Sequence, residues 1–155
     1  DPRYEYLKKH RREIIFAWTQ REYRNLTKAH ESGIRVPEVI TWLHNILIEE
    51  FIGDEQAAPQ LKDAIPQNPQ KFFDQIIKDI KKLYQGGLIH GDLSAFNILN
   101  YREKPYYIDF SQSTVTKTPN SEDLLIRDLT NIIHFFRKLG IKADLDQLLQ
   151  KIKSP

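Results

Sequence analysis

The stretch Leu88-Ile89-His90-Gly91-Asp92-Leu93-Ser94-Ala95-Phe96-Asn97-Ile98-Leu99 leads into a predicted tight turn at residues 102–104 and then into Tyr106-Tyr107-Ile108-Asp109-Phe110-Ser111-Gln112. Asn97 follows Asp92 by five positions, and the apolar run after the turn ends at a second carboxylate, Asp109. Transfer of a γ-phosphoryl group needs a carboxylate that orients the nucleophile and oxygen ligands for Mg²⁺. The stretch contains both, so it predicts a phosphoryl-transfer site.

The order of these residues makes the pattern more specific than any of its parts. An isolated Asp-x-x-x-x-Asn is common by chance, and an Asp before a turn usually caps it. Here His90, Asp92 and Asn97 are followed by a hairpin and by an apolar-apolar-Asp that ends at Asp109. This is the His-x-Asp-x-x-x-x-Asn arrangement of catalytic loops, with Asp-Phe-Ser where a protein kinase has Asp-Phe-Gly.

The segment before this stretch predicts a helix that supports it. From Lys71 to Tyr84 the apolar residues recur at helical spacing and form one broad stripe, and Gly86-Gly87 is placed to end the helix. A stripe of this kind indicates core rather than a cofactor-binding surface. Its members are Phe72, Phe73, Ile76, Ile77, Ile80, Leu83 and Tyr84.

The remaining chain predicts a mixture of helices and strands. We expect one long helix from Arg3 to about Glu31, with a break near its middle as the alternative, and another from about Glu122 to Leu139. Asp144 is expected to cap a last helix that runs to about Lys153. Two strands are expected at residues 39–42 and 46–51, whereas residues 53–69 are interpreted as a connector and residues 111–121 as a short polar link.

Composition excludes several classes of protein. The 155 residues contain no cysteine, which excludes disulfides and thiolate metal sites, and the net charge of +2 does not demand a nucleic-acid partner. No apolar run is long enough to span a membrane, so we expect a cytoplasmic protein without membrane contact. The basic cluster at residues 8–12 is interpreted as a solvated helix face rather than an RNA contact. The absence of methionine suggests a fragment or a processed chain.

On these residues the chain resembles the RIO family of atypical protein kinases, and its first subfamily more than its second. The resemblance implies an α+β, protein-kinase-like two-lobed fold with a trimmed C-lobe. Residues 1–52 would form a partial N-lobe and residues 53–155 the C-lobe. The matching pieces are residues 89–99, 108–113, Glu50-Phe51-Ile52-Gly53, Arg127-Asp128 with Asn131-Ile132-Ile133, and Trp18 with residues 21–26 and Val36-Pro37.

The resemblance also implies the roles of the site residues and the cofactors, ATP and Mg²⁺, with Mn²⁺ as the alternative cation. Two carboxylates are implied in catalysis, Asp92 as the catalytic Asp and Asp109 as the residue whose counterpart in some RIO proteins is proposed to become an aspartyl-phosphate. Asn97 and Asp109 would bind the metal. The nucleotide-binding residues would be Glu50, Phe51 and Ile52 of the hinge, together with Glu22, while His90 and Asp128 would have structural roles.

Two features depart from the family pattern. The glycine-rich loop and the ATP-binding Lys of these kinases lie on strands before the helix that carries Glu22, and no Val-Ala-Ile-Lys-like strand occurs here. We therefore expect Glu22 to lack its lysine partner. Glu49 stands where the residue before the hinge is usually apolar.

The resemblance implies a serine/threonine kinase or an ATPase that acts in small ribosomal subunit maturation, with a pre-ribosomal partner of protein and rRNA. A small-molecule phosphotransferase of the aminoglycoside or choline kinase type is one alternative, although little chain follows Asp109 to form a substrate-binding portion. A non-catalytic scaffold that docks through residues 8–12 is another. The phosphate acceptor, the choice between kinase and ATPase, and the oligomeric state stay open.

Overall fold

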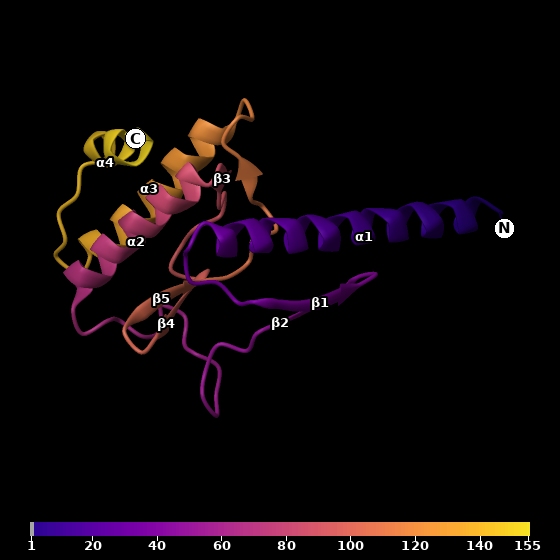
Figure 1. Ribbon diagram of the computed structural model, residues 1–155, viewed down its shortest axis with the longest axis horizontal. Coiled ribbons are helices and arrows are strands. Elements are labelled where there is room, and N and C mark those ends of the chain that lie inside the picture. Colours follow the sequence, from indigo (N-terminus) through magenta and orange to yellow (C-terminus); the bar gives the residue numbers. More distant parts are fainter. Residues whose placement is uncertain (1) are drawn as a thin grey trace.

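The computed structural model describes residues 2–155, and side chains from residue 10 onward. A long helix projects from a body of three helices and short strands (Figure 1). In chain order the elements are α1 (Pro2–Glu31), β1 (Val39–Leu43), β2 (Ile46–Glu49), α2 (Pro69–Gln85), β3 (Leu88–Ile89), β4 (Ile98–Tyr101), β5 (Lys104–Tyr107), β6 (Thr114–Val115), α3 (Ser121–Arg137) and α4 (Leu145–Lys153). The basic cluster is only partly described, because the side chains of Lys8 and Lys9 lie outside this range.

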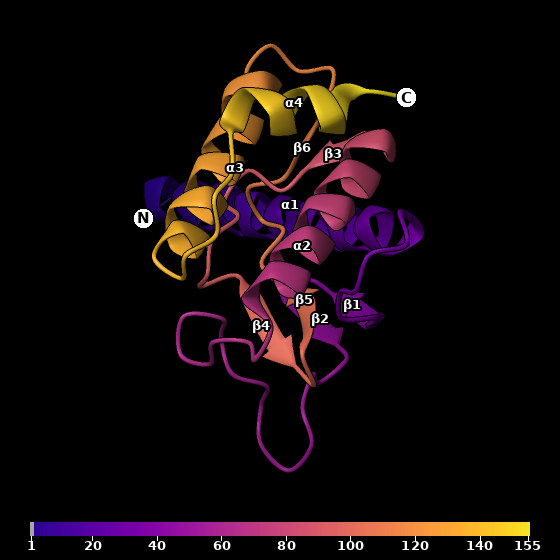
Figure 2. The same ribbon diagram turned by 90° about the vertical axis from the view of Figure 1, so that its left-hand side faces the viewer.

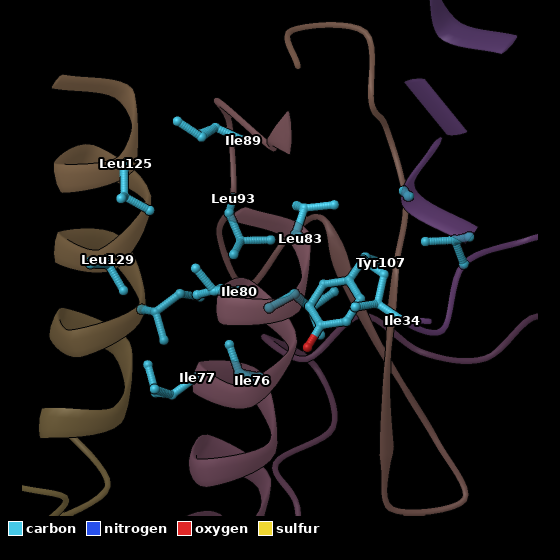
Figure 3. Close-up of a cluster of buried hydrophobic side chains, with 14 of the residues drawn as sticks. Ile34, Ile76, Ile77, Ile80, Leu83, Ile89, Leu93, Tyr107, Leu125 and Leu129 are labelled. Atoms are coloured by element: carbon cyan, nitrogen blue, oxygen red, sulfur yellow. The ribbon is translucent and has the colours of Figure 1, made fainter. Parts of the chain in front are cut away.

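Helix α2 is the centre of the core. It begins at Pro69, whose fixed φ suits a first helical turn, and the side chain of Asn68 accepts a hydrogen bond from the Lys71 N–H. Its apolar stripe packs between α3 and the β4–β5 hairpin (Figure 3). The expected stripe is confirmed as core: Phe72, Phe73, Ile76, Ile77, Ile80 and Leu83 are buried, and Tyr84 packs against them.

A buried polar contact joins α2 to β5 within this core. The Tyr107 hydroxyl donates to Asp79 Oδ2 at 2.9 Å, and Gln75 Nε2 donates to Asp79 Oδ1 at 2.8 Å. Burial raises the pKa of Asp79 despite these bonds. Because Tyr107 lies two residues before Asp109, the contact fixes the end of β5 relative to α2.

The segment at residues 53–69 is more ordered than a simple connector. It runs beside β4, where the Leu61 N–H donates to the Ile98 carbonyl at 2.7 Å and the Asn100 N–H donates to the Pro59 carbonyl at 2.9 Å. Leu61 is fully buried. The segment therefore pairs with the β4–β5 hairpin, which is antiparallel with Ile98 opposite Tyr107.

Helix α1 is continuous, so the alternative of a break near its middle is wrong. Only its C-terminal half reaches the core, through Leu26 and Ala29, whereas Trp18 is 67% exposed. The antiparallel β1–β2 hairpin lies beside the projecting part (Figure 1). None of the described helices is both long and apolar enough to cross a membrane.

The C-terminal helices cover one side of the body, with α4 packed across α2 and α3 (Figure 2). Asp144 caps α4, as expected, by accepting the Gln147 N–H at 2.9 Å. Residues 111–121, interpreted as a short polar link, also contain a strand, because Thr114 and Val115 form β6 and pair with β3. This pairing ties the residues after Asp109 to the strand that leads into His90.

Candidate active site

The loop from His90 to Asn97 connects β3 to β4 and brings Asp92 and Asn97 together. Asn97 Nδ2 donates to the Asp92 carbonyl at 2.9 Å and lies 3.4 Å from Asp92 Oδ2. Asp92 is exposed, whereas Leu93 and Ala95 on the same loop are buried. The loop is thus anchored in the core and presents the Asp92 carboxylate to solvent.

The buried side chain of Asp128 on α3 braces this loop. Its two carboxylate oxygens accept the Gly91 N–H and the Leu93 N–H, each at 2.8 Å, so the residues on both sides of Asp92 are held by one side chain. Burial raises the pKa of Asp128 to about 6, although the two backbone hydrogen bonds favour its ionised form. From the same helix, Asn131 donates to the Leu93 carbonyl and Arg127 to the Gly91 carbonyl.

His90 lies behind the loop, where 2% of its surface is exposed. Its Nε2 lies 3.0 Å from the Ile108 carbonyl, which can only accept, so Nε2 carries the proton and Nδ1 faces the Asp92 N–H at 3.4 Å. The ring packs on Phe110, with the two ring centroids 4.6 Å apart. Burial lowers the pKa of His90, so the imidazole is neutral in the fold.

This burial predicts a pH effect on stability. The unfolded chain binds a proton on His90 below its ordinary pKa of 6.5, whereas the folded chain does so only at lower pH, so stability is lost as the pH falls below 6.5. The free energy of unfolding of the native chain should exceed that of His90→Gln at pH 7.5, and the gap should shrink by pH 5. Urea unfolding of both chains checks this, because their other titrating groups cancel in the difference. A gap that widens towards pH 5 would contradict a neutral buried His90.

Asp109 follows β5 at the other side of the site. Its φ of 62° is a left-handed conformation that turns the chain directly after the strand, and Asp109 Oδ1 accepts from Ser111 Oγ at 2.6 Å. The next residue, Phe110, is buried, and its carbonyl accepts from Asn25 Nδ2 of α1 at 3.0 Å. The turn at Asp109 is therefore held from both the core and α1, and its carboxylate remains exposed.

Glu22 of α1 faces other carboxylates rather than a cation. Partial burial and the Asp109 charge raise the pKa of Glu22, and partial desolvation and the Glu22 charge raise the pKa of Glu49. Within the described side chains Glu22 makes no ion pair. The arrangement places an excess of negative charge beside Asp109.

The expected hinge borders a cavity of about 380 Å³. Its walls come from the hinge, the 53–69 segment, β4 and the end of β5. The Glu50 N–H is used by the Glu38 carbonyl and the Ile52 carbonyl accepts the Ala58 N–H, but the Glu50 carbonyl and the Ile52 N–H have no backbone partner among the described residues. The lining residues are Pro37, Glu49, Glu50, Phe51, Ile52, Ala57, Ala58, Gln60, Leu99 and Ile108.

The oxygen atoms at the site fit a magnesium ion. No group of three or more His, Asp or Glu side chains that could hold a metal occurs among the described residues. Mg²⁺ does not need one, because it takes one or two protein carboxylates and completes its shell with water and phosphate oxygens. Asn97 directs its amide nitrogen to Asp92, so its oxygen is left for a ligand, and Asp109 adds an exposed carboxylate.

Several contacts at the site could not be read from local sequence. Arg21 and Asn25 of α1 donate to the Ser113 carbonyl, at 2.9 and 3.3 Å, and Ser113 Oγ donates to the His90 carbonyl at 2.9 Å. Ala57, Ala58 and Gln60 enter the hinge cavity from a segment interpreted as a connector. No periodicity in this segment of the sequence indicates these contacts, because Ala57, Ala58 and Leu61 follow no regular spacing.

The braced loop and the carboxylate after β5 lie in a fold of the protein-kinase-like class. A Rio2 kinase from Chaetomium thermophilum, solved as an "ADP/Mg2+-phosphoaspartate complex", has the same fold, with a TM-score of 0.75, 24% identity and coverage of 93% of this chain and 47% of that one. The family model described as "RIO domain" matches residues 1–148. The chain therefore belongs to the RIO family, as its sequence predicted.

Curated relatives agree with this assignment. The chain is 42% identical to the RIO-type serine/threonine-protein kinase Rio1 of Methanocaldococcus jannaschii, over 98% of this chain and 53% of the relative. It is 34% identical to Rio1 of Haloferax volcanii, over 97% of this chain and 52% of the relative, and 34% identical to Rio1 of Thermoplasma acidophilum, over 99% and 81%. The chain thus spans about half the length of the first two relatives.

Proposed function

We propose that the chain transfers the γ-phosphoryl group of ATP, as a RIO-type serine/threonine kinase with ATPase activity. The contact between Asn97 and Asp92, on a loop braced by Asp128, is the observation that carries the proposal. It holds a carboxylate in the exposed position that an acceptor hydroxyl must reach. Positioning and charge stabilisation are what such a transfer requires of a protein.

Each residue then has a defined task. Asp92 orients the acceptor hydroxyl and accepts its proton as the new oxygen–phosphorus bond forms. The Glu50 carbonyl and the Ile52 N–H are free to pair with adenine, next to the exposed ring of Phe51. Asn97 and Asp109 would hold Mg²⁺, which when bound neutralises charge on the phosphates. Glu22 would form an ion pair with a cation in the nucleotide-binding part of the site.

Asp109 also supports a hydrolytic route. The solved Chaetomium thermophilum Rio2 complex is described as containing a phosphoaspartate. In this chain the exposed Asp109 carboxylate would attack the γ-phosphorus, the bond to ADP would break, and water would then release phosphate from the aspartyl group. We propose Asp109 for this role because it is the carboxylate directly after β5.

The experiment is incubation of the chain with ATP carrying a labelled γ-phosphate, with Mg²⁺ or with EDTA. We expect magnesium-dependent release of ADP and label on the chain. Hydroxylamine distinguishes the products, because it cleaves an acyl phosphate on Asp109 but leaves a serine or threonine ester intact. The absence of both nucleotide binding and label transfer in the presence of Mg²⁺ would overturn the proposal.

We further propose that residues 1–52 and 53–155 act as partial N-lobe and C-lobe, with the nucleotide between them, and that the protein acts in small ribosomal subunit maturation. Membership of the RIO family supports the second proposal. The position of the hinge cavity, which residues 49–52 line in part, supports the division into two lobes. Co-sedimentation with pre-ribosomal small subunits tests the partner directly.

A further inference from the structure

A second cavity, of about 410 Å³, lies on the other side of the Asp92 loop. It is bounded by α1, the loop residue Gly91, the segment after Asp109 and the start of α3. Most of its lining is polar, and it contains two arginines but no Asp or Glu. The lining residues are Arg21, Gly91, Gln112, Thr114, Thr118, Pro119, Asn120, Leu124 and Arg127.

The two arginines are held in place without neutralisation of their charges. Arg21 Nη2 donates to the Ser113 carbonyl at 2.9 Å, and Arg127 Nη2 donates to the Gly91 carbonyl. In the described part of the chain neither forms an ion pair with a carboxylate. Each guanidinium has five N–H donors, so most of them remain for a ligand. Both side chains are exposed, which leaves the cavity accessible from solvent.

Gly91 brings this cavity close to the candidate catalytic carboxylate. Its φ is 82°, and a Cβ at this position would lie 2.6 Å from the Gln112 carbonyl oxygen. Only glycine therefore allows the loop to approach residue 112 so closely. Asp92 follows Gly91 directly in the sequence. A group bound in the cavity would therefore lie close to an acceptor hydroxyl that reaches Asp92.

We propose that this cavity binds the phosphate group of a phosphorylated serine or threonine in a polypeptide substrate. The inference rests on the proposed kinase function and specifies its substrate class: a polypeptide that already carries one phosphate near the acceptor hydroxyl. Two guanidinium groups, one from α1 and one from α3, match the oxygens and the charge of up to −2 of a phosphate monoester, whereas the Thr114 and Thr118 hydroxyls bond to each other and to the Val115 carbonyl. A carboxylate would leave more of these donors unused.

A polypeptide phosphate fits better than an RNA backbone. The cavity is a local pocket with two cations, whereas RNA binding usually draws on an extended basic surface. Glu122 is paired with Lys153, but the exposed Asp123 in the first turn of α3 lies near the lining residue Asn120 and would repel a continuous line of phosphates. A single phosphate on a peptide avoids this repulsion.

The test is the affinity of the chain for a fluorescent peptide that contains one phosphothreonine and one serine acceptor, measured by anisotropy without ATP. Arg21→Gln and Arg127→Gln should each weaken binding about 10- to 100-fold, the loss expected for a charge-assisted hydrogen bond. Arg24→Gln on α1 and Arg137→Gln on α3 are matched controls, because both side chains are exposed and neither lines the cavity. Arg21→Lys should recover part of the affinity.

The outcomes separate this inference from the proposed function. Tighter binding of the phosphopeptide than of its unphosphorylated form, with dependence on both arginines, supports the inference even if no phosphoryl transfer is found. Transfer to peptides without any preference for the phosphorylated one would overturn it while the kinase proposal stands. Equal losses of phosphopeptide affinity in the Arg24 and Arg137 variants would also overturn it. So would displacement of the fluorescent phosphopeptide by single-stranded RNA at lower concentrations than by unlabelled phosphopeptide.

Discussion

Replacing Asp92 by Asn should reduce phosphoryl transfer from ATP by about 10²–10⁴-fold, the usual contribution of a positioned general base. The change keeps the size of the side chain and removes its ability to accept the proton of the acceptor hydroxyl. The Asn97 contact to the Asp92 backbone carbonyl survives the substitution, so the loop should keep its shape. Steady-state release of labelled phosphate or phosphopeptide at saturating Mg-ATP measures the effect.

Asp74→Asn is the matched control for this change. Asp74 is exposed on α2, where it accepts a hydrogen bond from Gln70, and its replacement should leave transfer unchanged. Asp92→Asn should also retain any docking on pre-ribosomal particles, since the side chain is not needed for the fold. Equal activity of the Asp92 variant and the native chain would exclude Asp92 as the general base, and loss of docking together with turnover would count against a separate scaffold role.

The candidate loop could be predicted from sequence because its chemistry is local. Asp92, Asn97 and Asp109 are separated by one loop and one hairpin, and the spacing of the three already limits how they can meet. The helices were predicted for a similar reason: the stripe of α2 and the Asp144 cap of α4 are patterns within single segments. The family resemblance added the hinge, which no local pattern indicates.

What could not be predicted depends on contacts between distant segments. Two-residue strands such as β3 and β6 have no periodicity of their own and exist because the chain brings Leu88 opposite Val115. The order of the 53–69 segment likewise comes from hydrogen bonds to β4. No local pattern relates Arg21 to Arg127, and only the fold brings both residues to the same cavity.

Replacing Asp128 by Ala should destabilise the fold by about 2–4 kcal/mol, because two buried backbone N–H groups lose their acceptor at about 1–2 kcal/mol each. The midpoint of thermal unfolding should fall by roughly 4–16 °C for a chain of this size. Transfer should also fall, even at temperatures where the variant is folded, because Gly91 and Leu93 no longer hold Asp92 in place. Calorimetry and the transfer assay measure the two effects.

Asp123→Ala, on the exposed side of α3, controls for the loss of a carboxylate. The pH dependence of the stability deficit distinguishes loss of the Asp128 hydrogen bonds from a simple packing defect. Burial raises the pKa of Asp128 to about 6, so the folded chain holds this proton more tightly than the unfolded chain. The native chain therefore loses stability through this group as the pH rises from about 4 to 6. The Ala variant lacks this titration, so its deficit should be larger at pH 5 than at pH 8. A deficit that grows with pH would mean that the Asp128 carboxylate is stabilised by its two hydrogen bonds more than burial destabilises it.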